Sequence, residues 1–481
     1  MLAFLKDIIG YIENKVDYGD ARIVDMEDEF ISMKNGVPEE VERRHSLGFG
    51  VRVLKNGRWG FSASYKMEKN EIKNVADFAI KLAEMSGKIE GEPIKLSQEE
   101  VSRGKYFSKI EKDPFDIPVE EKINLLIACD RNMAGVKGVS IRTGNLSAHR
   151  EHKFFASTDG AETEQNIVFT GGGISALSIK DGDIQKRSYP TSFGGNYRQQ
   201  GWEFIESLNL TEEAEKIAEE AVMLHSAKEC PSMETNLIID SDQLALQIHE
   251  SIGHALELDR VFGMEESYAG SSFATIDKLD NFRYGSNIMN ITADSTLPYG
   301  LGTFGYDDEG VKSMKAFLIK DGILRNYLSS RETAWKIKKK STAAMRASSW
   351  NRIPLVRMVN VSLLPGDWNF DDLIADTDDG ILLKTNRSWS IDDKRLNFQF
   401  GTEIGYRIKK GKIVEPLKNC LYSGITPNFW NSLDAVVNKE HFELWGIPNC
   451  GKGEPGQTMY VGHGTPPARF TGIRVGTRRS I

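Results

Sequence analysis

The sequence predicts an α+β protein, in which an N-terminal α/β region precedes a large β-rich C-terminal domain with a His-Glu-x-x-x-His helix. Two observations support this class. Apolar residues recur at helical spacing in several separate segments, and β-rich runs lie between those segments. After the last predicted helix, short strands, glycines and turns dominate the chain up to Ile481. Helices followed by a strand-dominated half are typical of α+β proteins.

Residues 1–92 are predicted to form an N-terminal α+β domain. Residues 21–66 are expected to be strands with a hairpin turn at Asn56 and Gly57, and a helix is expected over 70–88. The chain begins with an amphipathic helix and not with the continuous apolar stretch of a signal peptide. Charged residues separate its apolar positions, which are Leu2, Leu5, Ile9, Ile12 and Val16.

Residues 115–230 are predicted to form a central α+β segment. A charged stretch with three prolines precedes it and marks a domain junction. Helices over 118–135 and 211–229 enclose strand-like runs in this segment.

Residues 231–481 are predicted to form the β-rich C-terminal domain. A strand at its start leads into a helix over 241–259. Ser241 or Asp242 is expected to cap that helix, because hydroxyl and carboxylate oxygens accept hydrogen bonds from free backbone N–H groups there.

Composition excludes several classes of partner. The net charge is −8 without any basic block, which argues against nucleic acid. The four cysteines are too scattered for a disulfide framework and indicate a reducing compartment. No apolar run is long enough to span a bilayer. We therefore expect a soluble, cytoplasmic protein that does not bind a membrane.

The strongest chemical signal is the segment HESIGH at 249–254. Two histidines four residues apart share one helix face, but His249 and His254 are five apart. On an ideal helix their side chains would point roughly 140° apart. The rings can converge only where the helix widens by one residue or ends, and Gly253 makes that distortion easier.

A catalytic zinc site takes three protein ligands and leaves one position open. The candidates for the third ligand are Glu257, Asp259 and Cys450. Cys450 is favoured because a thiolate binds zinc strongly and nearby glycines let the backbone bend around an ion. We therefore expect one zinc ion per chain.

This ligand set predicts hydrolytic chemistry. Zinc lowers the pKa of a bound water towards ~7, and Glu250 is placed to act as the general base. Glu257 and Asp259 are expected to orient a ligand imidazole. His463 is expected to be a loop histidine with backbone hydrogen bonds, and residues 307–309 a solvated acidic turn.

The sequence resembles the TldD/PmbA family of metallopeptidases, on the TldD side that binds the metal. Four segments carry the resemblance, and they follow in family order through the C-terminal block. They are LALQIHESIGHALELD around the histidines, GTFGYDDEGV at 302–311, FGTEIGYRIKKGKIVEP at 400–416 and CGKGEPGQ at 450–457.

The resemblance implies that His249, His254 and Cys450 are the zinc ligands and that Glu250 is the catalytic glutamate. It also implies a peptide or unfolded protein substrate, bound extended in a cleft inside a dimer. The second subunit is commonly a homologue without the metal motif. The segment WSIDDKRLNFQFG at 389–401 departs from the family pattern, which is glycine-rich there.

Two alternatives remain. The first is a zinc amide hydrolase of a small substrate, which a closed pocket would favour. The second is a non-catalytic, zinc-containing subunit of a peptidase complex, in which replacement of Glu250 would leave the biological function intact.

Overall fold

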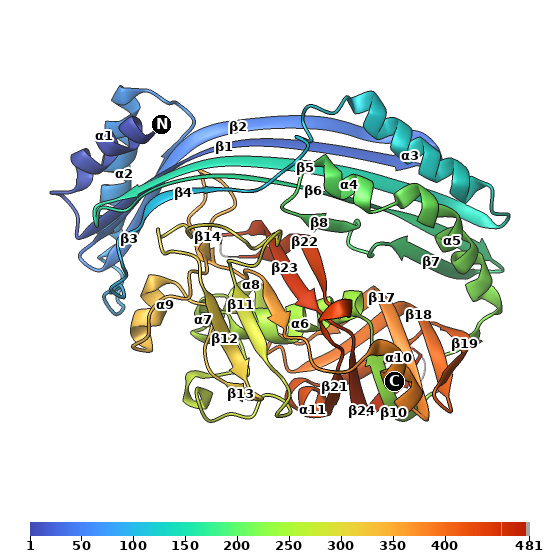
Figure 1. Ribbon diagram of the computed structural model, residues 1–481. Helices are drawn as coiled ribbons and strands as arrows, with labels where there is room; N and C mark the ends of the chain where they lie inside the picture. The colour runs from blue at the N-terminus through green and yellow to red at the C-terminus, as the bar shows by residue number, and fades with distance from the viewer. Residues whose placement is uncertain (454, 478–481) are drawn as a thin grey trace.

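The computed structural model describes residues 1–453 and 455–477. Glu454, within the predicted segment 450–457, and the last four residues of the predicted domain 231–481 lie outside the described residues. The chain forms two layers, a long curved sheet above and a C-terminal domain below (Figure 1).

The upper layer is an eight-stranded sheet in the order β3-β2-β1-β5-β6-β4, with β7 and β8 also paired to β6. Its four longest strands form two hairpins that pair antiparallel through β1 and β5. The strands are β1 (Tyr18–Lys34), β2 (Val37–Lys55), β3 (Arg58–Ser64), β4 (Arg103–Phe107), β5 (Val139–Ser157), β6 (Glu162–Lys180), β7 (Asp183–Tyr189) and β8 (Asn196–Arg198).

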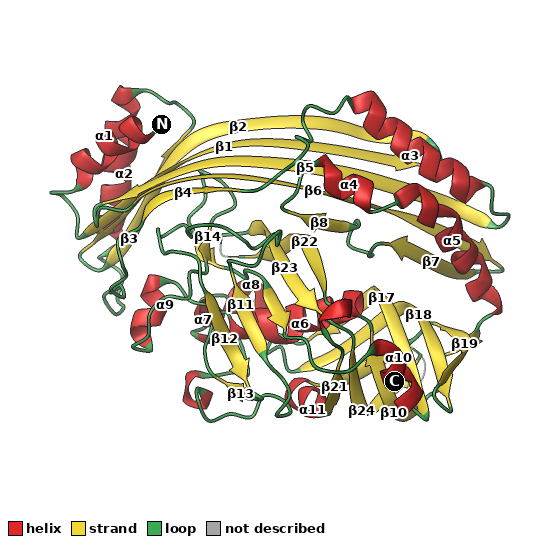
Figure 2. Cartoon of the chain, viewed as in Figure 1, coloured by secondary structure: helices red, strands yellow, loops and turns green. Residues whose placement is uncertain are grey.

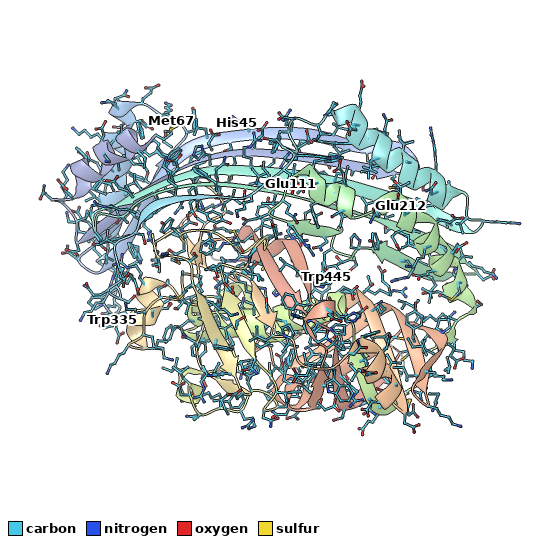
Figure 3. All side chains as sticks on the ribbon, in the orientation of Figure 1. His45, Met67, Glu111, Glu212, Trp335 and Trp445 are labelled. Carbon is cyan, nitrogen blue, oxygen red and sulfur yellow. The ribbon has the colours of Figure 1, made fainter. Side chains whose placement is uncertain are left out.

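Helices cover the two ends of this sheet and leave its middle open on the outer side (Figure 2). The helices α1 (Leu2–Ile12) and α2 (Lys69–Ser86) pack at one end, and α3 (Val119–Ala134), α4 (Trp202–Ser207) and α5 (Leu210–Met223) at the other. The outer middle is polar: His45, labelled in Figure 3, has a mostly exposed side chain and pairs with Asp25 at 2.7 Å. The outer middle of the sheet is therefore suited to contact with solvent.

The predicted helices of the first half are confirmed, although α5 ends at Met223, earlier than expected. The hairpin turn is also confirmed, with Asn56 and Gly57 at φ 52° and 71°. Because β1 and β5 are paired, the predicted segments 1–92 and 115–230 share one sheet. Their boundaries stay a prediction.

The C-terminal domain is built around a small closed barrel. Its strands follow the order β17-β10-β24-β20-β18, and β18 also pairs with β17, so the ring closes. Side chains from this ring, such as Leu237, Phe400 and Tyr422, belong to the largest apolar core of the protein. The ring strands are β10 (Met233–Ile239), β17 (Asp379–Ile391), β18 (Asn397–Lys409), β20 (Leu421–Ile425) and β24 (Ala468–Gly476).

Smaller elements complete this domain. β9 (Lys228–Glu229), β19 (Lys412–Lys418) and β21 (Leu433–Val436) extend the barrel sheet. A second sheet holds β11 (Ile291–Asp294), β12 (Lys315–Lys320), β13 (Ile323–Leu324) and β16 (Val361–Leu363). Two ribbons pair β14 (Met345–Arg346) with β15 (Leu355–Val356), and β22 (Glu443–Lys452) with β23 (Gln457–Thr465). The short helices are α7 (Leu258–Val261), α8 (Glu266–Ala269), α9 (Arg331–Lys336), α10 (Phe370–Asp376) and α11 (Thr426–Asn431).

Buried charges join the two layers. Lys153 on β5 lies 3.0 Å from Asp308, and Arg52 on β2 lies 3.3 Å from Glu309. Asp307, Asp308 and Glu309 are each no more than 3% exposed. The prediction of a solvated acidic turn is therefore wrong, because Asp308 and Glu309 face cations of the sheet and Asp307 accepts backbone hydrogen bonds.

Among the described residues, no helix combines the length and the apolar character needed to cross a bilayer.

Candidate metal centre

The histidine pair lies on a helix that changes its winding. Helix α6 (Ser241–Ile248) follows β10 directly, and Asp240 caps it by accepting from Ser241 N, so neither predicted cap is correct. The next five residues, His249–Gly253, are π-helical, and His254–Leu256 forms a 3-10 turn. The predicted widening is therefore confirmed. It brings the two imidazole rings to a centroid distance of 4.8 Å.

Gly253, the last residue of this widened segment, lies against the side chain of Met358. A Cβ at this position would lie 2.0 Å from Met358 Sδ, closer than two such atoms can approach. The absence of a side chain therefore allows the segment to pack where it does, in addition to easing the distortion.

The β22–β23 ribbon supplies the third candidate ligand. The register of the two strands shifts between Ile447 and Cys450, and such bulges re-aim side chains. Cys450 Sγ lies 3.6 Å from His254 Nε2. One ligand atom each from His249, His254 and Cys450 lie within 4.8 Å of one another. The structure thus brings together three residues that are up to 201 positions apart, since 450 − 249 = 201.

His463 determines which nitrogen of His249 is free. His463 Nδ1 donates to Val361 O at 2.9 Å, so its Nε2 is left as an acceptor for His249 Nδ1–H at 2.9 Å. Burial, followed by the nearby His249, lowers the pKa of His463 well below its ordinary value and keeps it neutral. His249 Nε2 therefore carries the lone pair. The predicted backbone hydrogen bond of His463 is confirmed, but its placement in a loop is wrong, because His463 lies in β23 and also contacts a candidate ligand.

Glu257 determines which nitrogen of His254 is free, as His463 does for His249. His254 Nδ1 donates to Glu257 Oε2 at 2.9 Å, which confirms the predicted orienting contact. Burial alone would raise the pKa of Glu257, but Lys452 and His254 hold it well below its ordinary value. Asp259 does not contact an imidazole; it binds Lys452 Nζ at 2.8 Å, so its predicted role is wrong.

The pKa shifts at the three candidate ligands all run towards the forms that bind a cation. Burial lowers the pKa of His249 to about 4 and also lowers that of His254. Burial would raise the pKa of the Cys450 thiol, but His254 and Arg357 together lower it below its ordinary value. Neutral imidazoles and an ionised thiol are the forms that coordinate metals.

Glu250 lies beside these ligands. It lines the same cavity of about 450 Å³ as His249, His254 and Cys450. Its Oε2 accepts a hydrogen bond of 2.5 Å from Arg395 Nη1. Sequence reasoning missed Arg395, and the one signal for it was the departure from the family pattern in residues 389–401.

Comparisons with known proteins agree with this arrangement. The chain matches the PmbA/TldA metallopeptidase domain 1 over residues 19–83, the central domain over 112–226 and the C-terminal domain over 232–477. A metalloprotease of Methanocaldococcus jannaschii is 33% identical over 93% of this chain and 94% of that protein.

Solved structures show the same fold. A Thermotoga maritima protein described as a proposed modulator of a DNA gyrase has a TM-score of 0.75 at 17% identity, over 98% of this chain and 99% of that one. TldE from Thermococcus kodakarensis has a TM-score of 0.69 at 16% identity, over 98% and 100%. With three matched domains and a close relative over nearly its whole length, the chain belongs to the PmbA/TldD family of metallopeptidases.

Proposed function

We propose that this metallopeptidase holds one zinc ion between His249, His254 and Cys450 and uses Glu250 as the general base. The observation that carries the proposal is the convergence of three ligand atoms within 4.8 Å in a cavity that Glu250 also lines.

The donor set fits zinc. Both imidazoles have their Nδ1 atoms engaged by His463 and Glu257, which leaves each Nε2 for an ion. Two imidazoles and one thiolate form a three-ligand set that leaves a fourth position for water or substrate. A thiolate ligand favours zinc over harder cations such as magnesium.

Zinc bound here would supply a Lewis acid that polarises the substrate carbonyl and acidifies a water molecule. The chain supplies the proton transfers. Glu250 takes a proton from the attacking water onto a carboxylate oxygen and then passes it to the nitrogen of the leaving amine. Its position directly after His249, in a rigid buried segment, fixes the carboxylate relative to the ligands.

The shape of the site supports an extended peptide as the substrate. A second cavity of about 600 Å³ shares Phe193, Trp389 and Asn449 with the first. Together they make a longer space than a closed pocket for a small amide would need. A peptide backbone can lie along such a space with little dependence on its sequence.

Replacement of Glu250 by Gln tests the proposal. We expect peptide hydrolysis to be lost while the zinc content stays near one per chain, because the amide keeps the shape but cannot take a proton. Glu234→Gln, an exposed position on β10, is the control. Full hydrolysis by zinc-loaded Glu250→Gln would contradict the role of Glu250.

We also propose that the chain works as a dimer, either with a second copy or with a homologue that lacks the metal motif. Support comes from the family resemblance alone. Light scattering should then give a mass near twice 53.9 kDa for the pure chain or for its mixture with that homologue. A mass of one chain in both samples would contradict the proposal.

A further inference from the structure

The hairpin between β17 and β18 brings a positively charged side chain into contact with Glu250. Arg395 lies in the loop of this hairpin, and its side chain is only 14% exposed. Its Nη1 donates to Glu250 Oε2 at 2.5 Å. Among the described residues that line the cavity of the ligands, Arg395 is the one arginine or lysine.

The loop that carries Arg395 is fixed to the body of the domain. Asp392 closes it by accepting from Leu396 N at 2.7 Å. Phe273 N donates to Lys394 O at 2.9 Å, and Thr426 Oγ1 donates to Arg395 O at 2.8 Å. Arg395 itself adopts a φ of 60°, a conformation that side chains rarely take without such support. The guanidinium is therefore aimed at the cavity by a rigid structure.

The guanidinium of Arg395 also has N–H donors that its hydrogen bond to Glu250 does not use. A guanidinium offers five N–H donors. Its bond to Glu250 is the one side-chain hydrogen bond that Arg395 makes among the described residues, and its buried Nε has no partner there. A buried donor without an acceptor is unfavourable in a folded protein. This is the pattern expected of a group whose acceptor arrives with the substrate.

We propose that Arg395 binds the carbonyl oxygen of the scissile peptide bond and stabilises the negative charge that develops on it. This rests on the proposed function of Glu250. The water that gives its proton to Glu250 must attack a carbon next to that carboxylate, so the carbonyl oxygen of the same carbon lies within reach of the guanidinium that touches Glu250.

The step balances without another reactant. The water oxygen forms a bond to the carbonyl carbon, the π pair of the C=O bond moves onto the oxygen, and the water proton goes to Glu250. Arg395 keeps its protons and donates hydrogen bonds to the new oxyanion. A fixed donor aimed at such an oxyanion acts mainly on the transition state.

Arg395→Ala and Arg395→Lys test this role, with Lys394→Ala as a control that removes the same charge from an exposed neighbour. We expect Arg395→Ala to lower kcat about 100- to 1,000-fold with a much smaller change in KM. Arg395→Lys should recover part of the loss, and Lys394→Ala should behave as wild type. Zinc content and thermal unfolding show whether each variant is folded.

Binding of a peptide that carries a tetrahedral phosphinate at the scissile position gives a readout without turnover. Arg395→Ala should weaken it by a factor similar to the fall in kcat/KM, because the phosphinate resembles the transition state. Equal binding by wild type and Arg395→Ala would overturn the inference. If Arg395→Ala weakened the binding only of peptides with a free C-terminal carboxylate, and not of amidated peptides, the inference would be overturned too. If the wild type binds no phosphinate and cleaves no peptide, the proposed function itself fails.

Discussion

At the scale of single residues, the site depends on hydrogen bonds that select nitrogen atoms. Two hydrogen bonds of 2.9 Å link Val361 O to His463 and His463 to His249. They leave one defined nitrogen of His249 for a metal. Glu257 does the same for His254. Such partners orient ligands before an ion arrives.

Replacement of His463 by Ala should weaken zinc binding about 10- to 100-fold, because His249 loses the acceptor that fixes its tautomer. Competition with a chromophoric chelator measures the affinity. His441→Ala, at an exposed position of the same domain, should leave the affinity unchanged. Unchanged affinity in a folded His463→Ala protein would refute the importance of this contact.

The sequence alone selected His249, Glu250, His254 and Cys450 as one candidate site, and in the structure these residues line one cavity. It was not sufficient for His463 and Arg395. Both act through contacts with the π-helical segment from elements far away in the sequence, at separations of 214 and 145 positions. Neither the residues around His463 nor the departure at 389–401 shows which group each side chain will face.

At the scale of elements, the π-helical segment was predictable because the spacing left few alternatives. Histidines five positions apart do not share one face of an α-helix, so the winding had to change for the rings to meet. The path of the backbone after the π-helical segment was not predictable from the sequence. The expected helix over 241–259 breaks after Leu256, and Glu257 N-caps the short helix α7 that follows, in extended backbone.

Gly253→Ala should destabilise the protein by about 1–3 kcal/mol, because its Cβ would overlap Met358 Sδ in a packed core. Chemical denaturation measures the change. Gly10→Ala is the matched control, since nothing lies within 4 Å of its Cβ in helix α1. That substitution should stabilise the helix slightly. Equal effects of the two substitutions would show that the close packing at Gly253 is unimportant.

At the scale of the whole molecule, buried ion pairs fix the sheet to the C-terminal domain. The sequence suggested water around residues 307–309 because acidic turns are usually solvated. The cations that face Asp308 and Glu309 lie 155 and 257 positions away, on β5 and β2. Such distances leave no local signal in the sequence, so its pattern predicted neither that residues 1–92 and 115–230 share one sheet nor how that sheet is joined to the C-terminal domain.

Asp308→Asn should lower the free energy of unfolding by about 3–5 kcal/mol near neutral pH, because Lys153 and Arg22 would lose a buried partner. Burial alone would raise the pKa of Asp308, but these cations lower it from 3.8. The stabilisation is therefore present above pH 3.8 and is lost as the pH falls through the lower folded pKa. The difference between variant and wild type should shrink in acid.

Asp280→Asn serves as the control for this measurement. Asp280 is 55% exposed in its pair with Arg325. Its replacement should change stability by less than about 1 kcal/mol. A comparable loss in both variants would contradict a special role for the buried pairs.

The central claim is that one zinc ion is held by two imidazoles and one thiolate. X-ray absorption at the zinc edge of the zinc-loaded protein tests it most directly. We predict one sulfur at about 2.3 Å and two nitrogens at about 2.0–2.1 Å, with the sulfur lost in Cys450→Ser. A spectrum without sulfur, or one that Cys450→Ser leaves unchanged, would contradict the account.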